Sequence, residues 1–161
     1  MEAKRDMMKK VPVREQDPKV RATNFKEVCL GYNMEEAVAE SERCLNCKNA
    51  KCIAGCPVSI NIPAFIQEVK AGNIEEAAKV IALSSALPAV CGRVCPQESQ
   101  CEGQCVRGIK GEAVSIGKLE RFVADWSREH GIVPAAPEKT NGKKVAVIGS
   151  GPAGLTCAGD L

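Results

Sequence analysis

The order of apolar and polar residues predicts a largely helical chain, because apolar side chains recur three and four positions apart in several stretches. The first helix is expected over residues 34–43, where Asn33 and Glu36 form the sequence pattern of a capping box. This helix would end directly before Cys44. It would therefore deliver the first cysteine of a dense cysteine run to its site.

Two further helices are predicted between this run and a second group of cysteines. One begins at Asn61 with Pro63 in its first turn and stops at Gly72. The next repeats the capping pattern at Asn73 and ends at the Leu87-Pro88 pair. Each helix has one apolar face, formed by Ile62, Phe65, Ile66 and Val69 in the first and by Ile74, Ala77, Ala78 and Ile81 in the second.

A longer amphipathic helix is predicted from about residue 113 to residue 130, and Gly131 is a natural stop for it. Its apolar face consists of Ile116, Leu119, Val123 and Trp126. We expect all of these faces to pack into one helical core. Residues 1–33, in contrast, show no sustained periodicity and carry interleaved charges, so we expect an extended, solvated N-terminal arm.

The chain changes character after the last predicted helix. Residues 131–142 are rich in Pro, Ala and Gly and are expected to form an interdomain linker. Residues 143–148 form an apolar run typical of a buried strand. A G-x-G-x-x-G pattern follows directly, and its cofactor-binding candidates are Gly149, Gly151 and Gly154.

A strand, a glycine loop and the start of a helix, in this order, are typical of a dinucleotide-binding domain. The acidic residue expected about 20 positions further on would lie past Leu161. We therefore interpret residues 143–161 as the first strand and glycine loop of a truncated FAD/NAD(P)-binding domain. We expect residues after about 140 to be poorly ordered or to pair with another chain.

Composition narrows the possible functions. A net charge of +2 gives no basis for binding nucleic acid, which requires a clustered basic surface. The chain shows no signal peptide and no apolar run of about 18 residues, so we expect a cytoplasmic protein with no membrane contact. His130 is the only histidine, and no nucleophile–base pair is apparent, so we expect no catalytic residue.

Ten cysteines in such a protein favour metal ligation over disulfides, because cytoplasmic thiols stay reduced. Eight of them lie in two runs, C-x2-C-x4-C-x3-C-P over residues 44–57 and C-x3-C-P-x4-C-x3-C over residues 91–105. Three close cysteines followed by Cys-Pro resemble the bacterial ferredoxin spacing, in which the cysteine before proline ligates the other cluster. The x4 gap departs from the ferredoxin x2, so the loop must differ.

By this logic Cys44, Cys47 and Cys52 hold a first cluster, and Cys105 crosses back from the second run to complete it. The second cluster takes Cys56, Cys95 and Cys101, and spacing alone makes Cys91 its fourth ligand. The alternative from another class is a zinc-stabilised interaction module. Cys29 and Cys157 lie outside the pattern, and we expect them to be buried as small apolar residues.

Three segments resemble a known family: RCLNCKNAKCIAGCPVSINIP, AVCGRVCPQESQCEGQC and SIGKLERFVADW, at residues 43–63, 89–105 and 115–126. They are similar to the N-terminal domain of the small (β) subunits of NADPH-dependent glutamate synthase. The same domain occurs in the large subunit of electron-bifurcating NADH-dependent ferredoxin:NADP oxidoreductase and at the N-terminus of dihydropyrimidine dehydrogenase. The resemblance covers roughly residues 20–161.

The resemblance implies a mainly α, ferredoxin-like domain over residues 34–130 that holds two [4Fe–4S] clusters. In the full-length parent, FAD- and NADPH-binding domains would follow it. The implied function is electron transfer between the flavin and a partner, either the glutamate synthase large subunit or a ferredoxin. The alternative parent is the large subunit of an electron-bifurcating transhydrogenase.

The resemblance also implies a different fourth ligand for the second cluster. In this family a polar side chain on the later helix takes that position, a glutamine in dihydropyrimidine dehydrogenase and a glutamate in bifurcating enzymes. Aligning residues 115–122 places Glu120 there. The resemblance therefore favours Glu120 over Cys91.

Overall fold

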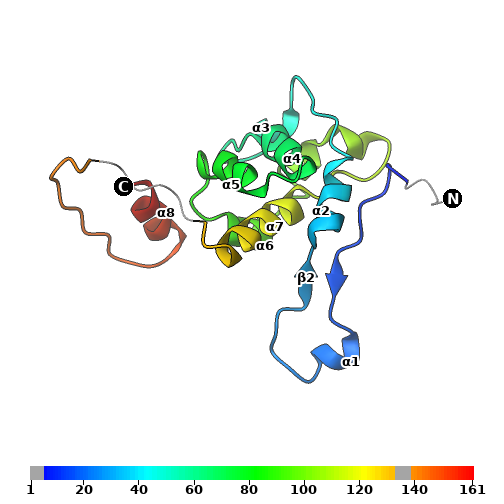
Figure 1. Cartoon of the computed structure of the whole chain (residues 1–161), viewed down its shortest axis with the longest axis horizontal. Coiled ribbons are helices and arrows are strands. Elements are labelled where there is room, and N and C mark those ends of the chain that lie inside the picture. Colours follow the sequence, from blue (N-terminus) through cyan, green and yellow to red (C-terminus); the bar gives the residue numbers. More distant parts are fainter. Residues whose placement is uncertain (1–5, 133–138) are drawn as a thin grey trace.

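The computed structural model describes residues 6–132 and 139–161 and is mainly helical (Figure 1). The body consists of α2 (Met34–Ser41), α4 (Ile62–Lys70), α5 (Ile74–Ala82), α6 (Pro88–Val94) and α7 (Ile116–Glu129). The shorter elements are α1 (Pro18–Arg21), α3 (Lys51–Ala54), the 3-10 turns η1 (Glu102–Gln104) and η2 (Val106–Ile109), α8 (Pro152–Asp160), and the strands β1 (Arg14–Glu15) and β2 (Cys29–Gly31). The prediction of a mainly helical fold is confirmed.

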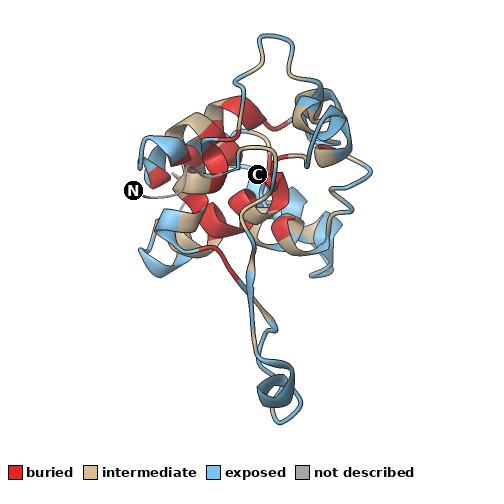
Figure 2. Cartoon of the chain, turned by 90° about the vertical axis from the view of Figure 1, so that its right-hand side faces the viewer, coloured by how far each residue is buried: buried red, intermediate tan, exposed pale blue. Residues whose placement is uncertain are grey.

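Helix α7 is the centre of the body, because it contacts α2, α4, α5 and α6. The apolar faces predicted for α4, α5 and α7 meet there, and Figure 2 shows their buried sides turned inward. Phe65 and Leu119 are completely buried, whereas Ala78 and Trp126 are only half-buried. The predicted helical core is thus present.

Helix starts follow the predicted caps in two cases and differ in the third. At α2, Asn33 and Glu36 form the full capping box. At α4, the side chain of Asn61 accepts a hydrogen bond from the Ala64 N–H. The side chain of Asn73 does not cap α5, because it donates instead to Glu68 Oε2 at 3.1 Å.

Pro88 begins a helix, whereas the sequence pattern predicted that it ends one. Helix α5 already stops at Ala82, and Pro88 occupies the first turn of α6, where its missing N–H has no helical partner to lose. The result is an additional helix that carries Cys91.

The N-terminal arm is not extended throughout, and this part of the prediction is wrong. Strands β1 and β2 pair antiparallel, and α1 lies in the loop between them. Figures 1 and 2 show this hairpin projecting away from the helical body. Phe25, near its tip, is fully exposed.

The strand predicted at residues 143–148 is absent, since no described residue there is in a strand and Ile148 is 97% exposed. A strand needs neighbouring strands for its hydrogen bonds, and the described part of the chain provides none there. The glycine loop itself is present and leads into α8: Gly149 has φ of 111°, and a Cβ at Gly154 would clash with the Gly149 carbonyl. Part of the predicted 131–142 linker lies outside the described residues.

None of the described helices is both long enough and apolar enough to cross a membrane.

Candidate metal centre

Four thiols from both cysteine runs line one cavity. They are Cys44, Cys47, Cys52 and Cys105, the set assigned above to the first cluster. The cavity contains about 410 Å³ of space between atoms, part of it open to solvent. Its other walls are mostly apolar and include Ile62, Pro63, Ile66, Val114 and Ile116. We call this cavity the first site.

Local structure turns these thiols toward the cavity. Cys44 follows α2 in a turn in which its N–H donates to Ser41 O at 3.0 Å. Asn46 has a positive φ of 47°, which reverses the chain between Cys44 and Cys47. Cys52 lies in the short helix α3, and Cys105 lies between η1 and η2.

The thiols of the first site fit a group that carries positive charge. Burial raises the pKa of Cys44, and burial together with the neighbouring Cys105 and Cys44 raises the pKa of Cys52 to about 11. Four thiolates packed this closely repel one another unless a bound cation compensates them. Iron in a [4Fe–4S] cluster, which takes four cysteine thiolates, supplies that compensation.

The second site brings together Cys56, Cys95, Cys101 and Glu120. Burial raises the pKa of Cys101 to about 12, and the charges of Glu102, Cys56 and Glu120 add to the effect. Burial also raises the pKa of Cys95 to about 11, with further contributions from Cys91, Glu120 and Cys56. These mutual effects show that the side chains lie within electrostatic reach of one another.

Glu120 is a buried carboxylate without a hydrogen-bond partner for its Oε1 atom. It lies on α7 and is 7% exposed, and burial raises its pKa to about 7. A buried carboxylate oxygen without a partner costs free energy, so such an atom calls for an explanation. The donor set of three thiols and one carboxyl fits a cluster whose iron would bind that oxygen.

Close packing of α6 on α7 places both candidate fourth ligands at the second site. A Cβ at Gly92 would lie 2.7 Å from the backbone nitrogen of Arg121, so only glycine permits this approach. Helix α6 carries Cys91, and the Cys91 carbonyl accepts a hydrogen bond from the Gln97 amide at 3.0 Å. The Cys91 side chain also raises the pKa of Cys95, so these two side chains lie close together. Geometry therefore brings Cys91 and Glu120 to the same place.

Within the described residues, no group of three or more His, Cys, Asp or Glu side chains is arranged to hold a single metal ion. A zinc site would need its sulfur donors about 2.3 Å from one ion. A [4Fe–4S] cluster binds its four thiolates through different iron atoms and does not need them around a single ion.

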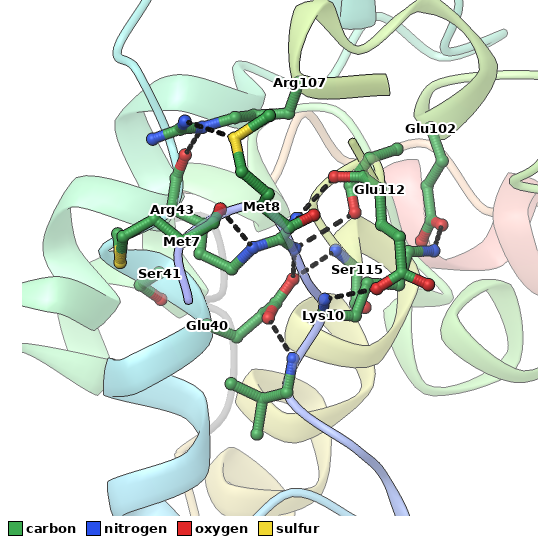
Figure 3. A network of polar contacts seen from close by, with 12 residues as sticks. Met7, Met8, Lys10, Glu40, Ser41, Arg43, Glu102, Arg107, Glu112 and Ser115 are labelled. Atoms are coloured by element: carbon green, nitrogen blue, oxygen red, sulfur yellow. Dashed lines mark hydrogen bonds and ion pairs between the residues drawn. The ribbon is translucent and has the colours of Figure 1, made fainter. Parts of the chain in front are cut away.

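A buried polar network supports the first site, and the sequence reasoning did not identify it (Figure 3). Glu40 and Arg43 form an ion pair whose side chains are completely buried. The Glu40 carboxylate accepts from the N–H groups of Val11 and Ser115 at 2.7 and 2.8 Å. Arg43 donates to the carbonyl oxygens of Met7, Glu112 and Ala113.

This network ties the N-terminal arm to the residue before Cys44. Lys10 adds a link toward the second site, because its Nζ lies 2.8 Å from Glu102 Oε2, next to Cys101. The expectation of a solvated arm is therefore wrong for the stretch around Met8 and Lys10. The available signal was a Glu at the end of the predicted helix and an Arg three residues later, directly before Cys44.

Residues outside the two sites have other environments. Cys157 is exposed and Cys29 is half-buried, so the expectation that both are buried is wrong. Cys157 lies on α8, a helix in which no residue is buried within the described part of the chain. His130 lies at the end of α7, where its ring stacks on Trp126 with the ring centroids 3.9 Å apart.

Comparison with known proteins adds a family and relatives. Residues 21–132 match the family described as dihydropyrimidine dehydrogenase domain II, 4Fe–4S cluster. The chain is 43% identical over 154 residues to the glutamate synthase [NADPH] small chain of Halomonas elongata. The aligned region covers 92% of this chain and 33% of that protein.

Two Escherichia coli proteins are also similar. The chain is 44% identical over 140 residues to the putative oxidoreductase UacF, covering 86% of this chain and 22% of that protein. It is 40% identical over 119 residues to the NAD-dependent dihydropyrimidine dehydrogenase subunit PreT, covering 74% of this chain and 29% of that protein. The chain thus spans about a third or less of the length of these relatives.

Proposed function

The chain belongs to the dihydropyrimidine dehydrogenase domain II, 4Fe–4S cluster family, and from this premise we propose that it holds two [4Fe–4S] clusters and transfers single electrons. The observation that carries the proposal is the first site, where thiols from two distant runs line one cavity. The ligands would be Cys44, Cys47, Cys52 and Cys105 for the first cluster and Cys56, Cys95, Cys101 and Glu120 for the second. Each bound cluster would supply one-electron redox chemistry.

The chain's own residues would hold the clusters and limit access of water. Apolar side chains such as Ile62, Ile66 and Ile116 form much of the wall of the first site. Cys56 and Cys105 would each come from one run and ligate the cluster held mainly by the other. Such crossing would make cluster binding and folding one coupled process.

Glu120 is our choice for the fourth ligand of the second cluster. Its unpartnered buried Oε1 supports this choice, because a ligand bond to iron would satisfy that atom. Cys91 then remains a neighbouring thiol that raises the pKa of Cys95. A carboxylate is a harder ligand than a thiolate, and ligand identity is one determinant of cluster potential.

The parent that we propose is a cytoplasmic oxidoreductase of the glutamate synthase small-chain type. The similarity to small chains over most of this sequence supports it. In that parent, NADPH would reduce FAD, and electrons would pass through the clusters to or from the large subunit or a ferredoxin. Residues 34–130 would form the cluster domain, residues 131–142 a linker, and residues 143–161 the first part of the FAD-binding domain.

Anaerobic reconstitution of the chain with iron and sulfide tests this proposal. We expect a brown protein with broad visible absorbance that dithionite bleaches, and a measurable one-electron transfer to oxidised ferredoxin in stopped-flow mixing. A colourless protein that retains only zinc after reconstitution would contradict the proposal. Loaded clusters that cannot reduce ferredoxin or a glutamate synthase large subunit would contradict the electron-transfer role.

A further inference from the structure

The two sites differ in the charges around them. The wall of the first site includes two cationic residues, Lys51 and Arg107, and among the described residues that line it there is no Asp or Glu. At the second site the buried Glu120 takes the place of a fourth thiolate and has the same formal charge, so the difference comes from the residues around the ligands. Glu102, whose side chain is only 11% exposed, lies next to the second-site ligand Cys101 in the chain.

Arg107 lines the first site, and Figure 3 shows its contacts with Arg43 and Met8. Its Nε donates to the Arg43 carbonyl at 2.7 Å, and its Nη1 lies 3.9 Å from the Met8 sulfur. Arg43 directly precedes Cys44, and Arg107 follows Cys105 by two residues. The hydrogen bond from the guanidinium therefore joins the backbone next to Cys44 to the segment that carries Cys105.

A fixed cation matters most when the group beside it gains negative charge. Reduction adds one electron to a cluster, and local charge is one of the determinants of cluster potential. A cation in the partly desolvated wall of a cavity stabilises the added charge more than a cation in open water does. Glu102, next to the second-site ligand Cys101, acts in the opposite direction, although Lys10 partly compensates it.

We propose that Arg107 is a positioning residue that raises the reduction potential at the first site above that at the second site, with Lys51 as a smaller contributor. This inference rests on the proposed function, because it requires both sites to hold clusters. When one electron is shared, the second site is oxidised and the first site is reduced, and no bond is made or broken. The shared electron then resides mainly at the first site.

The test is a redox titration of the reconstituted full chain, with dithionite as reductant and EPR as readout. Arg107→Gln is expected to make reduction at the first site about tenfold less favourable, which is about 59 mV for a one-electron couple. The second site should not shift, and Cys95→Ser identifies which signal belongs to it. Arg107→Lys, which keeps the charge, should recover most of the potential.

The matched control is Lys26→Gln, which removes the same charge from an exposed residue of the projecting hairpin. It should leave both potentials unchanged. The inference is overturned if Arg107→Gln moves neither potential, moves both equally, or moves the lower of the two.

Iron and sulfide contents separate this inference from the proposed function. A wild-type chain that loads fewer than two clusters contradicts the proposed function. Two loaded clusters with potentials insensitive to Arg107 contradict only the inference. If Arg107→Gln does not load the first site, the exposed Lys51 provides the second variant. Lys51→Gln should make reduction at the first site about twofold to threefold less favourable. An unchanged potential in this variant would overturn the inference.

Discussion

Both sites take donors from the two cysteine runs, but they differ in the number of thiols assigned to each. The first site has four thiols around one cavity with a mainly apolar wall. The second has three thiols assigned to it, a further thiol at Cys91, and a buried carboxyl at Glu120 whose Oε1 has no partner. The donors that line the first site are thus all thiols, whereas the set proposed for the second site includes a carboxyl from α7.

Different contacts stabilise the two sites. The first site is supported by the buried Glu40–Arg43 pair and the N-terminal arm that it binds. The second is supported by the close approach of α6 and α7 at Gly92. Substitutions can therefore perturb one site and leave the other as an internal reference.

The largest effect is expected from the two crossing cysteines. Cys105→Ala should remove the first cluster and Cys56→Ala the second, so each should lower the iron content by about half. Iron and sulfide analysis after anaerobic reconstitution measures this. Cys157→Ala, an exposed cysteine far along the chain, is the control and should retain full iron content. Full loading of Cys105→Ala would show that the assigned crossing is wrong.

The next largest effect is expected from two substitutions that show whether Glu120 or Cys91 is the fourth ligand of the second cluster. Glu120→Ala should release iron from the second cluster or change its EPR signal, while the first cluster stays intact. Cys91→Ala should keep both clusters with unchanged spectra. The reverse pattern, with iron lost only in Cys91→Ala, would assign the ligand to Cys91.

Breaking the buried ion pair should destabilise the side of the molecule that carries the first site. Glu40→Ala leaves Arg43 buried without its carboxylate, and such a change lowers the free energy of unfolding by about 3–5 kcal/mol. Urea unfolding followed by circular dichroism measures it. The control is Glu75→Ala, which breaks an exposed pair with Lys79 on α5 and should leave the midpoint unchanged. Equal stability of both variants would mean that the network does not support the fold.

The smallest effect is expected from Gly92→Ala, at the contact between α6 and α7. Helix propensity alone would favour alanine by about 1 kcal/mol. The added Cβ would lie 2.7 Å from backbone and side-chain atoms of Arg121, so overpacking should produce a net loss of about 1–3 kcal/mol. The second cluster should become more labile toward chelators than the first.

The matched control for this change is Gly108→Ala, where the nearest atom to a new Cβ is 3.7 Å away. This contact is ordinary, so stability and cluster lability should stay close to wild type. If Gly92→Ala behaves like Gly108→Ala, the close approach does not hold the second site together.

Helical periodicity predicted the body of the fold because its apolar faces are regular. The faces of α4 and α7 are buried as expected, and the capping box at Asn33 is present. Pro88 was misassigned because proline both ends and begins helices, and only the short length of α5 distinguishes these roles. The strand at 143–148 failed because local propensity does not supply neighbouring strands.

The cysteine spacing grouped Cys44, Cys47 and Cys52, which share short loops, and the ferredoxin-like crossing added Cys105; all four thiols line one cavity. The spacing could not identify Glu120, which lies 15 residues after Cys105 and looks like any solvated helix residue. Only the family resemblance pointed to it. The Glu40–Arg43 pair was missed for a related reason, since the partners that bury it come from the arm and from the segment before α7.

Native mass spectrometry of the anaerobically reconstituted chain tests the central claim most directly, because it counts the inorganic groups on each molecule. The account predicts one dominant species that carries two four-iron, four-sulfide units per chain, with about half that added mass in Cys105→Ala and in Cys56→Ala. A dominant wild-type species with a single cluster, or with zinc in place of iron and sulfide, would contradict it.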